Sequence, residues 1–199
     1  MKITVAITGA SGAVYGVSLL EFLLKEKHRV TLALTPSARI IIQAELGVSW
    51  GSCFNETSDI LKKRYPNSDL LYCNETDMTA PIASGSHPTD AMVIAPCSMK
   101  AMAAIAHGMS SNLIERAADV TLKERRPLIL VPRETPLSSI HLKNMLTLSE
   151  MGAWIIPAMP AFYNRPKTID DMVGFIVGRV LDRLGISNRM YTRWKEEPS

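Results

Sequence analysis

The sequence predicts an α/β protein, a three-layer α/β/α sandwich on a parallel sheet of the flavodoxin-like or Rossmann-like kind. Three observations support this prediction. Short apolar runs alternate with segments of helical periodicity along the whole chain. A glycine-rich turn at 9–16 follows the first such run and precedes a helical pattern. The 199 residues, 47% hydrophobic and 21% charged, suffice for one folded domain but not for two.

Strands are expected where short β-branched or apolar runs end at a turn, and helices where apolar residues recur three or four positions apart. The clearest strand is 91–95, which is apolar throughout and is followed by Pro96. The expected strands span 3–8, 30–34, 70–73, 91–95, 128–131 and 154–156. The expected helices between them span 17–24, 40–46, 60–64, 98–106, 112–123 and 139–151.

The last helix is the best-defined element of the sequence. Thr168 and Asp171 fit a capping box at its start, and Arg183 and Gly185 are typical of a helix end. One apolar stripe lies between them, formed by Ile169, Met172, Val173, Ile176, Val180 and Leu184. The chain has no linker, repeat or composition shift, so residues 1–199 are expected to form a single domain.

Charge and metal-ligand residues exclude several functional classes. The 22 Lys and Arg against 19 Asp and Glu give a net charge of +3, too little for a nucleic-acid surface unless it is concentrated. The three cysteines form no Cys-x-x-Cys pair and no two of the four histidines lie three to five residues apart, so neither disulfides nor a metal site are expected. No signal peptide and no apolar run of membrane-spanning length is recognisable, which favours a soluble, cytoplasmic protein.

Ligands of such sheets bind beyond the carboxyl ends of the strands, where the connecting loops gather. The loops 9–16, 35–37, 96–100 and 132–136 are therefore expected to form the functional site. Small residues in the first loop allow backbone amides to approach an anion, although the pattern is neither Gly-x-Gly-x-x-Gly nor a P-loop. The bland alternative is a tight connection without a ligand. Ser11 in this turn could bind a ligand or cap the following helix.

Two other segments carry polar side chains with chemical potential. Ser98 could cap a helix and also present its hydroxyl to a ligand, whereas Cys97 is a poor nucleophile candidate because no histidine is near in sequence. Arg116 and Lys123 lie seven positions apart on one helix face and could together hold a phosphate. The alternative for this charged helix is a solvated face with internal ion pairs.

Charged and aromatic residues also follow the later strands. Arg133 and Glu134 come directly after the strand 128–131, which favours a functional role, and Glu134 is a candidate general acid or base. The proline-bracketed loop 159–166 could wall an apolar pocket with its aromatic residues or simply pack a crossover. Arg179, near the end of the last helix, is explained by helix-end electrostatics alone.

Taken together, these motifs are familiar, and the chain resembles the UbiX-type flavin prenyltransferases over nearly its whole length. The segment 47–89 matches least well, apart from Ser-Gly-Ser at 84–86. The matching segments are GASGAVYG at 9–16, PCSMK at 96–100, RAADV at 116–120, LKERR at 122–126, PRETPL at 132–137, IHL at 140–142, NM at 144–145 and PAFY at 160–163.

The resemblance implies a flavodoxin-like homododecamer that uses reduced FMN as a substrate and needs no metal. It implies transfer of a dimethylallyl group from dimethylallyl monophosphate to the flavin N5 and then C6. The product, prenylated FMN, would serve a UbiD-type decarboxylase. The tail from about 186 would pack on a neighbouring subunit or on the active site.

The resemblance also assigns roles to individual residues. The FMN contacts would be Gly9, Ala10, Ser11, Thr35, Ser98, Met99, Lys100, Ala101 and Arg133. The catalytic residues would be Ser11, Glu45, Arg116, Lys123 and Glu134. Tyr163 and Arg179 would contact the prenyl phosphate, with Trp194 near them. Two positions depart from the family pattern, since Thr35 replaces a frequent Ser and Ala101 a frequent Thr.

Two other functions are compatible with a flavin-binding α/β domain. An FMN-dependent cysteine decarboxylase of related fold would carry a Pro-x-Met-Asn motif, which is not found here. A flavin-delivery subunit without activity would need no second phosphate site, whereas Arg116, Lys123 and Arg179 suggest one.

Overall fold

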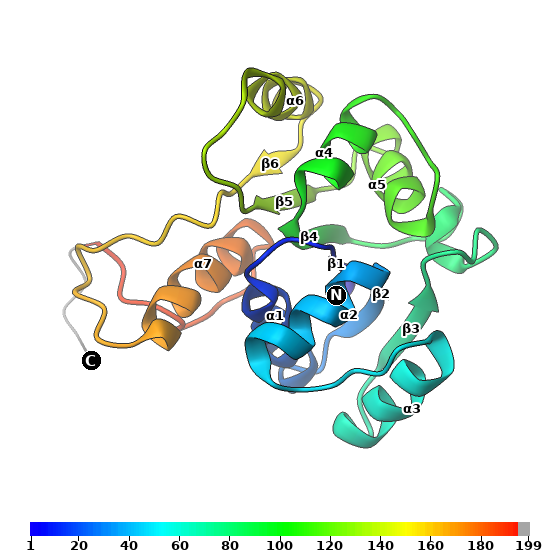
Figure 1. The fold of residues 1–199 in the computed structure, drawn as a ribbon, viewed down its shortest axis with the longest axis horizontal. Helices are drawn as coiled ribbons and strands as arrows, with labels where there is room; N and C mark the ends of the chain where they lie inside the picture. Colours follow the sequence, from blue (N-terminus) through cyan, green and yellow to red (C-terminus); the bar gives the residue numbers. More distant parts are fainter. Residues whose placement is uncertain (195–199) are drawn as a thin grey trace.

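A computed structural model describes residues 1–194, which contain a six-stranded parallel sheet (Figure 1). The strand order is β3-β2-β1-β4-β5-β6, so the chain builds one half of the sheet from β1 outward and then crosses to the other half. This is the Rossmann order, with its switch point between β1 and β4. The strands are β1 (Lys2–Ile7), β2 (Arg29–Leu34), β3 (Leu70–Asn74), β4 (Ala91–Cys97), β5 (Leu128–Pro132) and β6 (Trp154–Ile155).

Helices cover both faces of the sheet, which confirms the three-layer sandwich. Successive side chains of a strand point to opposite faces, and along β1 Val5 and Ile7 enter one core while Ala6 enters the other. The first core is closed by α1 and α7, and the second by α4, α5 and α6. The helices are α1 (Ala13–Lys25), α2 (Pro36–Leu46), α3 (Phe54–Arg64), α4 (Met99–Ala106), α5 (Leu113–Lys123), α6 (Ser139–Glu150) and α7 (Ile169–Arg183), with a 3-10 turn η1 at Pro81–Ala83.

Three helices begin earlier than the sequence predicted, and the first of them, α1, begins at Ala13 instead of residue 17. Helix α2 begins at Pro36 instead of residue 40, because the Thr35 side chain accepts from the Ala38 amide at 3.2 Å and proline suits the first helical turn. Helix α3 begins at Phe54 instead of residue 60. Its first turns are polar, so the apolar periodicity used for prediction only becomes visible near its end.

Two further expectations need correction. Strand β4 does not end before Pro96 but continues to Cys97, and its pairing with β5 shifts register between Ile94 and Cys97. Such an irregularity accommodates proline, which has no amide hydrogen for the ladder. The capping box of Thr168 and Asp171 is present, but Ile169 at the head of the predicted apolar stripe is 76% exposed.

Two segments extend away from the sheet beside α7, at the left of Figure 1. They are residues 157–168, which connect β6 to α7, and residues 186–194, which follow α7; together they are called the arm. Within residues 1–194, no helix is both long and apolar enough to cross a membrane.

Candidate active site

The loops after β1, β2, β4 and β5 lie side by side because these strands are neighbours in one parallel sheet. Thr8, which sequence analysis did not single out, ties two of them together. Its buried hydroxyl donates to the Pro96 carbonyl at 2.8 Å and accepts from the Ser98 amide at 2.7 Å. The third loop is fixed by the Thr35 amide, which donates to the Ile7 carbonyl at 3.1 Å.

A cavity of about 320 Å³ lies over these strand ends. Five of the residues predicted to contact FMN line it, namely Gly9, Thr35, Ser98, Lys100 and Ala101. Sequence analysis missed several others, namely Thr8, Glu75, Asn112, Ile114 and Glu115. The carboxylate of Glu115 is buried and accepts from the Ser111 amide at 2.8 Å, so it is held within its own loop.

Gly9 is required by the close approach of α2 to the first loop. A Cβ on Gly9 would stand 2.5 Å from the Cβ of Ser37, a separation that real side chains do not adopt. Helices α2 and α4 both begin at this cavity, with Thr35 and Ser98 as their N-caps. Their positive dipole ends therefore favour a negatively charged ligand group there.

Glu45 occupies the amino terminus of α1. Its carboxylate accepts from the Gly12 amide at 2.9 Å and from the Ala13 amide at 2.9 Å. Gly12 is the N-cap, in a left-handed conformation with φ of 98°, so Ser11 does not cap this helix. The anion expected at these amides is thus a side chain of the protein itself. Burial and the nearby Glu45 carboxylate together raise the pKa of Tyr15.

Arg133 connects the loop after β5 to the glycine-rich loop. Its Nε donates to the Ser11 carbonyl at 3.2 Å, across 122 residues of sequence. Glu134 is exposed beside it and accepts from the Thr135 amide at 3.0 Å. Cys97 is fully buried, and burial raises the pKa of its thiol to about 12, which agrees with its exclusion as a nucleophile.

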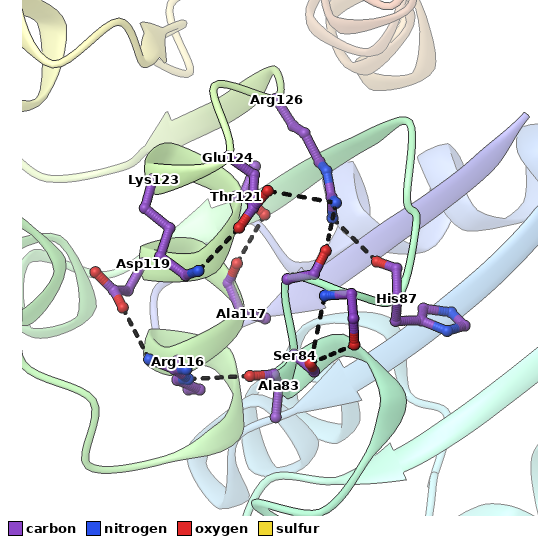
Figure 2. Close-up of polar contacts among 12 residues, drawn as sticks. Ala83, Ser84, His87, Arg116, Ala117, Asp119, Thr121, Lys123, Glu124 and Arg126 are labelled. Atoms are coloured by element: carbon purple, nitrogen blue, oxygen red, sulfur yellow. Dashed lines mark hydrogen bonds and ion pairs between the residues drawn. The ribbon is translucent and has the colours of Figure 1, made fainter.

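Arg116 and Lys123 lie on the side of α5 that faces η1 and the segment after it (Figure 2). Arg116 donates to the Ala83 carbonyl at 3.0 Å and pairs with Asp119 at 3.1 Å. Lys123 pairs with Glu124 at 2.9 Å. The internal ion pairs that the alternative of a solvated helix face predicts are therefore present.

The Ser-Gly-Ser segment at 84–86 lies beside these cations. Arg126 donates to the Gly85 carbonyl at 2.7 Å and to the His87 carbonyl at 3.0 Å (Figure 2). A side chain on Gly85 would collide with Glu124 and would approach Lys123 Nζ to 3.1 Å. The one well-matched part of 47–89 thus lies against the end of α5.

Tyr163 and Trp194 form an aromatic cluster on the arm. Their rings meet edge to face with centroids 5.0 Å apart, and Tyr163 contacts Phe175 of α7 in the same manner at 6.1 Å. Tyr163 is 43% exposed and Trp194 is 66% exposed. Arg179 is exposed on the same helix as Phe175. The structure therefore brings the three predicted donor contacts to one helix and its flanking segments.

The predicted site residues do not all meet in one chain. Helix α5, with Arg116 and Lys123, packs in the second core, whereas α7, with Arg179, packs in the first. The sheet lies between these two cores, so the cations of α5 and the aromatic cluster are on opposite faces of it. No group of three or more histidine, cysteine, aspartate or glutamate side chains in residues 1–194 is arranged to hold a metal ion.

Known proteins give an independent view of this arrangement. A model of the Flavoprotein family matches residues 1–181. The flavin prenyltransferase UbiX of Methanocaldococcus jannaschii is 50% identical to the chain over 194 residues, which are 98% of each protein. The chain belongs to the UbiX flavin prenyltransferase family. The UbiX of Pseudomonas aeruginosa is 46% identical over 98% of this chain and 95% of its own length.

Solved structures support UbiX membership over the cysteine decarboxylase alternative. AnUbiX in complex with FMN and dimethylallyl pyrophosphate has a TM-score of 0.88 at 39% identity, over 99% of this chain and 98% of its own. A dodecameric FMN-dependent UbiX-like decarboxylase from Escherichia coli O157:H7 has a TM-score of 0.88 at 44% identity, over 98% of this chain and 100% of its own. The FMN-dependent cysteine decarboxylase TvaF is only 19% identical, with a TM-score of 0.56, and shares the fold alone.

Proposed function

We propose that this UbiX family member is a flavin prenyltransferase that joins a dimethylallyl group from dimethylallyl monophosphate to N5 and C6 of reduced FMN. The observation that carries the proposal is the cavity at the strand ends. It is lined by residues to which the family resemblance assigns flavin contacts, among them Thr35, Ser98 and Lys100. It also receives the amino termini of α2 and α4, which suit the phosphate of FMN.

The two departures from the family pattern are compatible with flavin binding here. Thr35 retains a hydroxyl, although that hydroxyl accepts from the Ala38 amide as a helix cap. Ala101 lies within the first turn of α4, and its amide donates to the Ser98 hydroxyl at 3.3 Å. A threonine hydroxyl at position 101 would add a polar group to the cavity wall, and its absence leaves contacts from the backbone and from Lys100.

Donor ionisation needs cations and a water-poor surface. When the allylic carbon–oxygen bond breaks, its electron pair stays on the phosphate, and an allylic cation remains. Arg116, Lys123 and Arg179 would balance the charge of the leaving phosphate, and Tyr163 would donate a hydrogen bond to it. Aromatic rings of Tyr163 and Trp194 would keep water from the cation. No metal is required in this scheme, because side chains supply the positive charge.

Proton transfer is assigned to Glu134. The first new bond joins the allylic carbon to N5, which loses its proton. The second bond joins C6 to the tertiary carbon of the prenyl group, while the prenyl double bond takes up one proton and C6 releases one. Glu134 is exposed at the end of β5 beside Arg133, where a carboxylate can act as acid and base in turn, with the released phosphate as a second proton carrier.

A complete site would require several copies of the chain. Since α5 and α7 lie on opposite faces of the sheet, we propose a homo-oligomer, a dodecamer like that of the Escherichia coli O157:H7 relative, in which different copies supply these groups. The arm suits such an assembly because it leaves Phe162 69% exposed. We place the protein in the cytoplasm and propose that a UbiD-type decarboxylase uses its prenylated FMN.

Anaerobic incubation of the purified protein with reduced FMN and dimethylallyl monophosphate tests the proposal. Mass spectrometry of the released flavin is expected to show a species heavier by one dimethylallyl unit. Oxidised FMN serves as the control and should remain unmodified. The diphosphate donor is assayed in parallel, because AnUbiX was crystallised with dimethylallyl pyrophosphate. Unmodified flavin with both donors would refute the prenyltransferase function.

A further inference from the structure

Residues 188–194, called the tail below, lie in a groove on α7. The groove exists because two residues of this helix have no side chain. Gly174 and Gly178 are one helical turn apart and buried, on the face that meets residues 188–191. A Cβ on Gly174 would lie 2.5 Å from the Met190 carbonyl oxygen, and one on Gly178 would collide with the ring of Tyr191. Any larger side chain at either position would therefore displace the tail.

Asp182 lies one further turn along the same face and binds the tail through its carboxylate. Arg193 donates from both terminal nitrogens, at 2.7 and 2.9 Å, which is the bidentate geometry of the stronger ion pairs. The Tyr191 hydroxyl donates at 2.6 Å and the Asn188 amide at 3.0 Å. The Asp182 side chain is only 20% exposed, so these contacts are partly shielded from solvent.

The charge state of Asp182 suits this role. Burial alone would raise its pKa, but the hydrogen bonds from Arg193, Tyr191 and Asn188 outweigh that effect and lower the pKa below its ordinary value. A carboxyl group whose pKa is lowered on folding is ionised at neutral pH, and its stabilising effect is lost only when acid protonates it.

The tail reaches each residue assigned to the prenyl donor. Trp194 directly follows Arg193 and packs edge to face on Tyr163 at 5.0 Å. Tyr191 packs on Phe175 at 5.1 Å, and Phe175 in turn contacts Tyr163. The Tyr191 hydroxyl donates to Asp182, and Arg179 lies close enough to this hydroxyl to oppose the rise in its pKa that burial and Asp182 cause. Asp182 is thus one or two contacts from Tyr163, Arg179 and Trp194.

We propose that Asp182 is a positioning residue which holds residues 188–194 in the Gly174–Gly178 groove and thereby sets Tyr163, Arg179 and Trp194 for the prenyl donor. This proposal rests on the proposed function for the identity of the donor. It places a specificity-determining contact outside the residues that family resemblance assigned. It also explains two glycines in the middle of a helix, where glycine is otherwise unfavourable.

Three variants of the full-length protein test it. Asp182→Asn removes the charge at nearly constant shape, and Asp182→Glu keeps the charge as the conservative rescue. Gly178→Ala acts by steric exclusion instead, and alanine forms helices better than glycine, so α7 itself should not be weakened. Asp170→Asn is the matched control, an exposed carboxylate in the first turn of the same helix.

Three measurements separate positioning from general stability. Trypsin cleavage after Arg189 and Arg193, followed by mass spectrometry, reports release of the tail. We expect Asp182→Asn and Gly178→Ala to be cleaved about tenfold faster, as befits the loss of a charged hydrogen-bond network. The KM for dimethylallyl monophosphate should rise about tenfold, and the affinity for FMN should stay within about twofold. Asp182→Glu should recover part of the KM, and Asp170→Asn should match the wild type.

The contrary outcomes are distinct. An unchanged donor KM in variants whose tail is released would overturn the positioning role. A loss of FMN affinity as large as the rise in donor KM would overturn it as well. If the wild type fails to prenylate FMN at all, the proposed function is at fault. In that case the cleavage assay still tests whether Asp182 and the Gly174–Gly178 groove hold residues 188–194. Faster cleavage of Asp182→Asn and Gly178→Ala supports this holding role, and cleavage at the wild-type rate overturns it.

Discussion

The strand-end cavity and the arm are built in opposite ways. Around the cavity, Thr8, Cys97 and Ala101 are buried, and the loops are fixed by the ends of strands that lie deep in the sheet. On the arm, Phe162 is 69% exposed and Trp194 is 66% exposed, and order depends on a few aromatic and ionic contacts with α7. The cavity proposed to bind flavin is thus determined by the core of one chain.

The difference suggests a division of labour. A ligand that must be held rigidly, such as an aromatic flavin, is placed where the core fixes the backbone. In the proposed function, a donor that must enter, ionise and leave as phosphate would bind elements that one chain only partly supports. Other copies and the tail would then complete that half of the site.

The largest effect is expected when two inactive variants are mixed, which tests whether the two regions come from different copies of the chain. Arg116→Ala with Lys123→Ala removes the α5 cations, and Tyr163→Phe with Arg179→Leu removes proposed donor contacts of the arm and of α7. Each double variant alone should be nearly inactive. Equal amounts of the two variants, unfolded and refolded together, should regain about a quarter of the wild-type rate. In a random mixture, each of the two groups has a chance of about one half to come from a copy that carries it intact.

The control for this experiment is to mix the two oligomers without dissociating them. That sample should stay inactive. Co-assembled oligomers that show no recovery would mean that one chain supplies both groups, contrary to their positions on opposite faces of the sheet.

Replacing Glu134 by glutamine should slow the chemical step without altering the two proposed binding regions. Glutamine cannot exchange protons, so the prenylation rate should fall about 10²- to 10⁴-fold, the usual contribution of general acid–base catalysis. Folding and FMN affinity should be retained because Glu134 is exposed and its carboxylate accepts a hydrogen bond from the adjacent Thr135 amide. Single-turnover kinetics would measure the effect, and an unchanged rate would remove Glu134 from catalysis.

Gly16→Ala would disturb the packing beneath the glycine-rich loop. A Cβ on Gly16 would collide with the Ala95 carbonyl and with Ile7, where α1 crosses β1 and β4. We expect a loss of about 1–3 kcal/mol in the free energy of unfolding, typical of overpacking. Urea denaturation measures it, with Ser18→Ala on the same helix expected to stay within about 0.5 kcal/mol of wild type. Equal stability of the two variants would contradict the tight packing described here.

A smaller effect is expected from Glu45→Gln. The carboxylate caps α1 through the Gly12 and Ala13 amides but is exposed, so its loss should cost about 0.5–1 kcal/mol of unfolding free energy. Glu26→Gln, at the opposite end of α1, should be neutral or slightly stabilising by the same argument. If prenylation also slows far more than stability falls, Glu45 has the active-site role that family resemblance gave it.

Local sequence patterns predicted the position of the strand-end cavity well. The strands and the loops after them follow from apolar runs, turn residues and the general rule for ligand sites in parallel sheets, which located Gly9, Thr35 and Ser98 correctly beside one another. The starts of α2 and α3 were missed because capping and polar first turns leave no apolar period.

Contacts between distant segments could not be predicted from local patterns. Glu45 meets Gly12 across 33 residues, and nothing in the periodicity of either segment indicates the pairing. The same holds for Gly85 beside Lys123 and for the tail in the groove of α7. Only the spacing of Gly174, Gly178 and Asp182, four residues apart on one helix face, was a readable signal.

The separation of flavin and donor binding is tested most directly by measuring the FMN dissociation constant and the donor KM in two variants. Lys100→Ala, at the cavity, should raise the FMN dissociation constant about 10- to 100-fold and leave the donor KM near that of the wild type. Arg179→Leu, on α7, should raise the donor KM by a similar factor and leave FMN binding within about twofold. Parallel changes of both constants in both variants would contradict a site assembled from two separate halves.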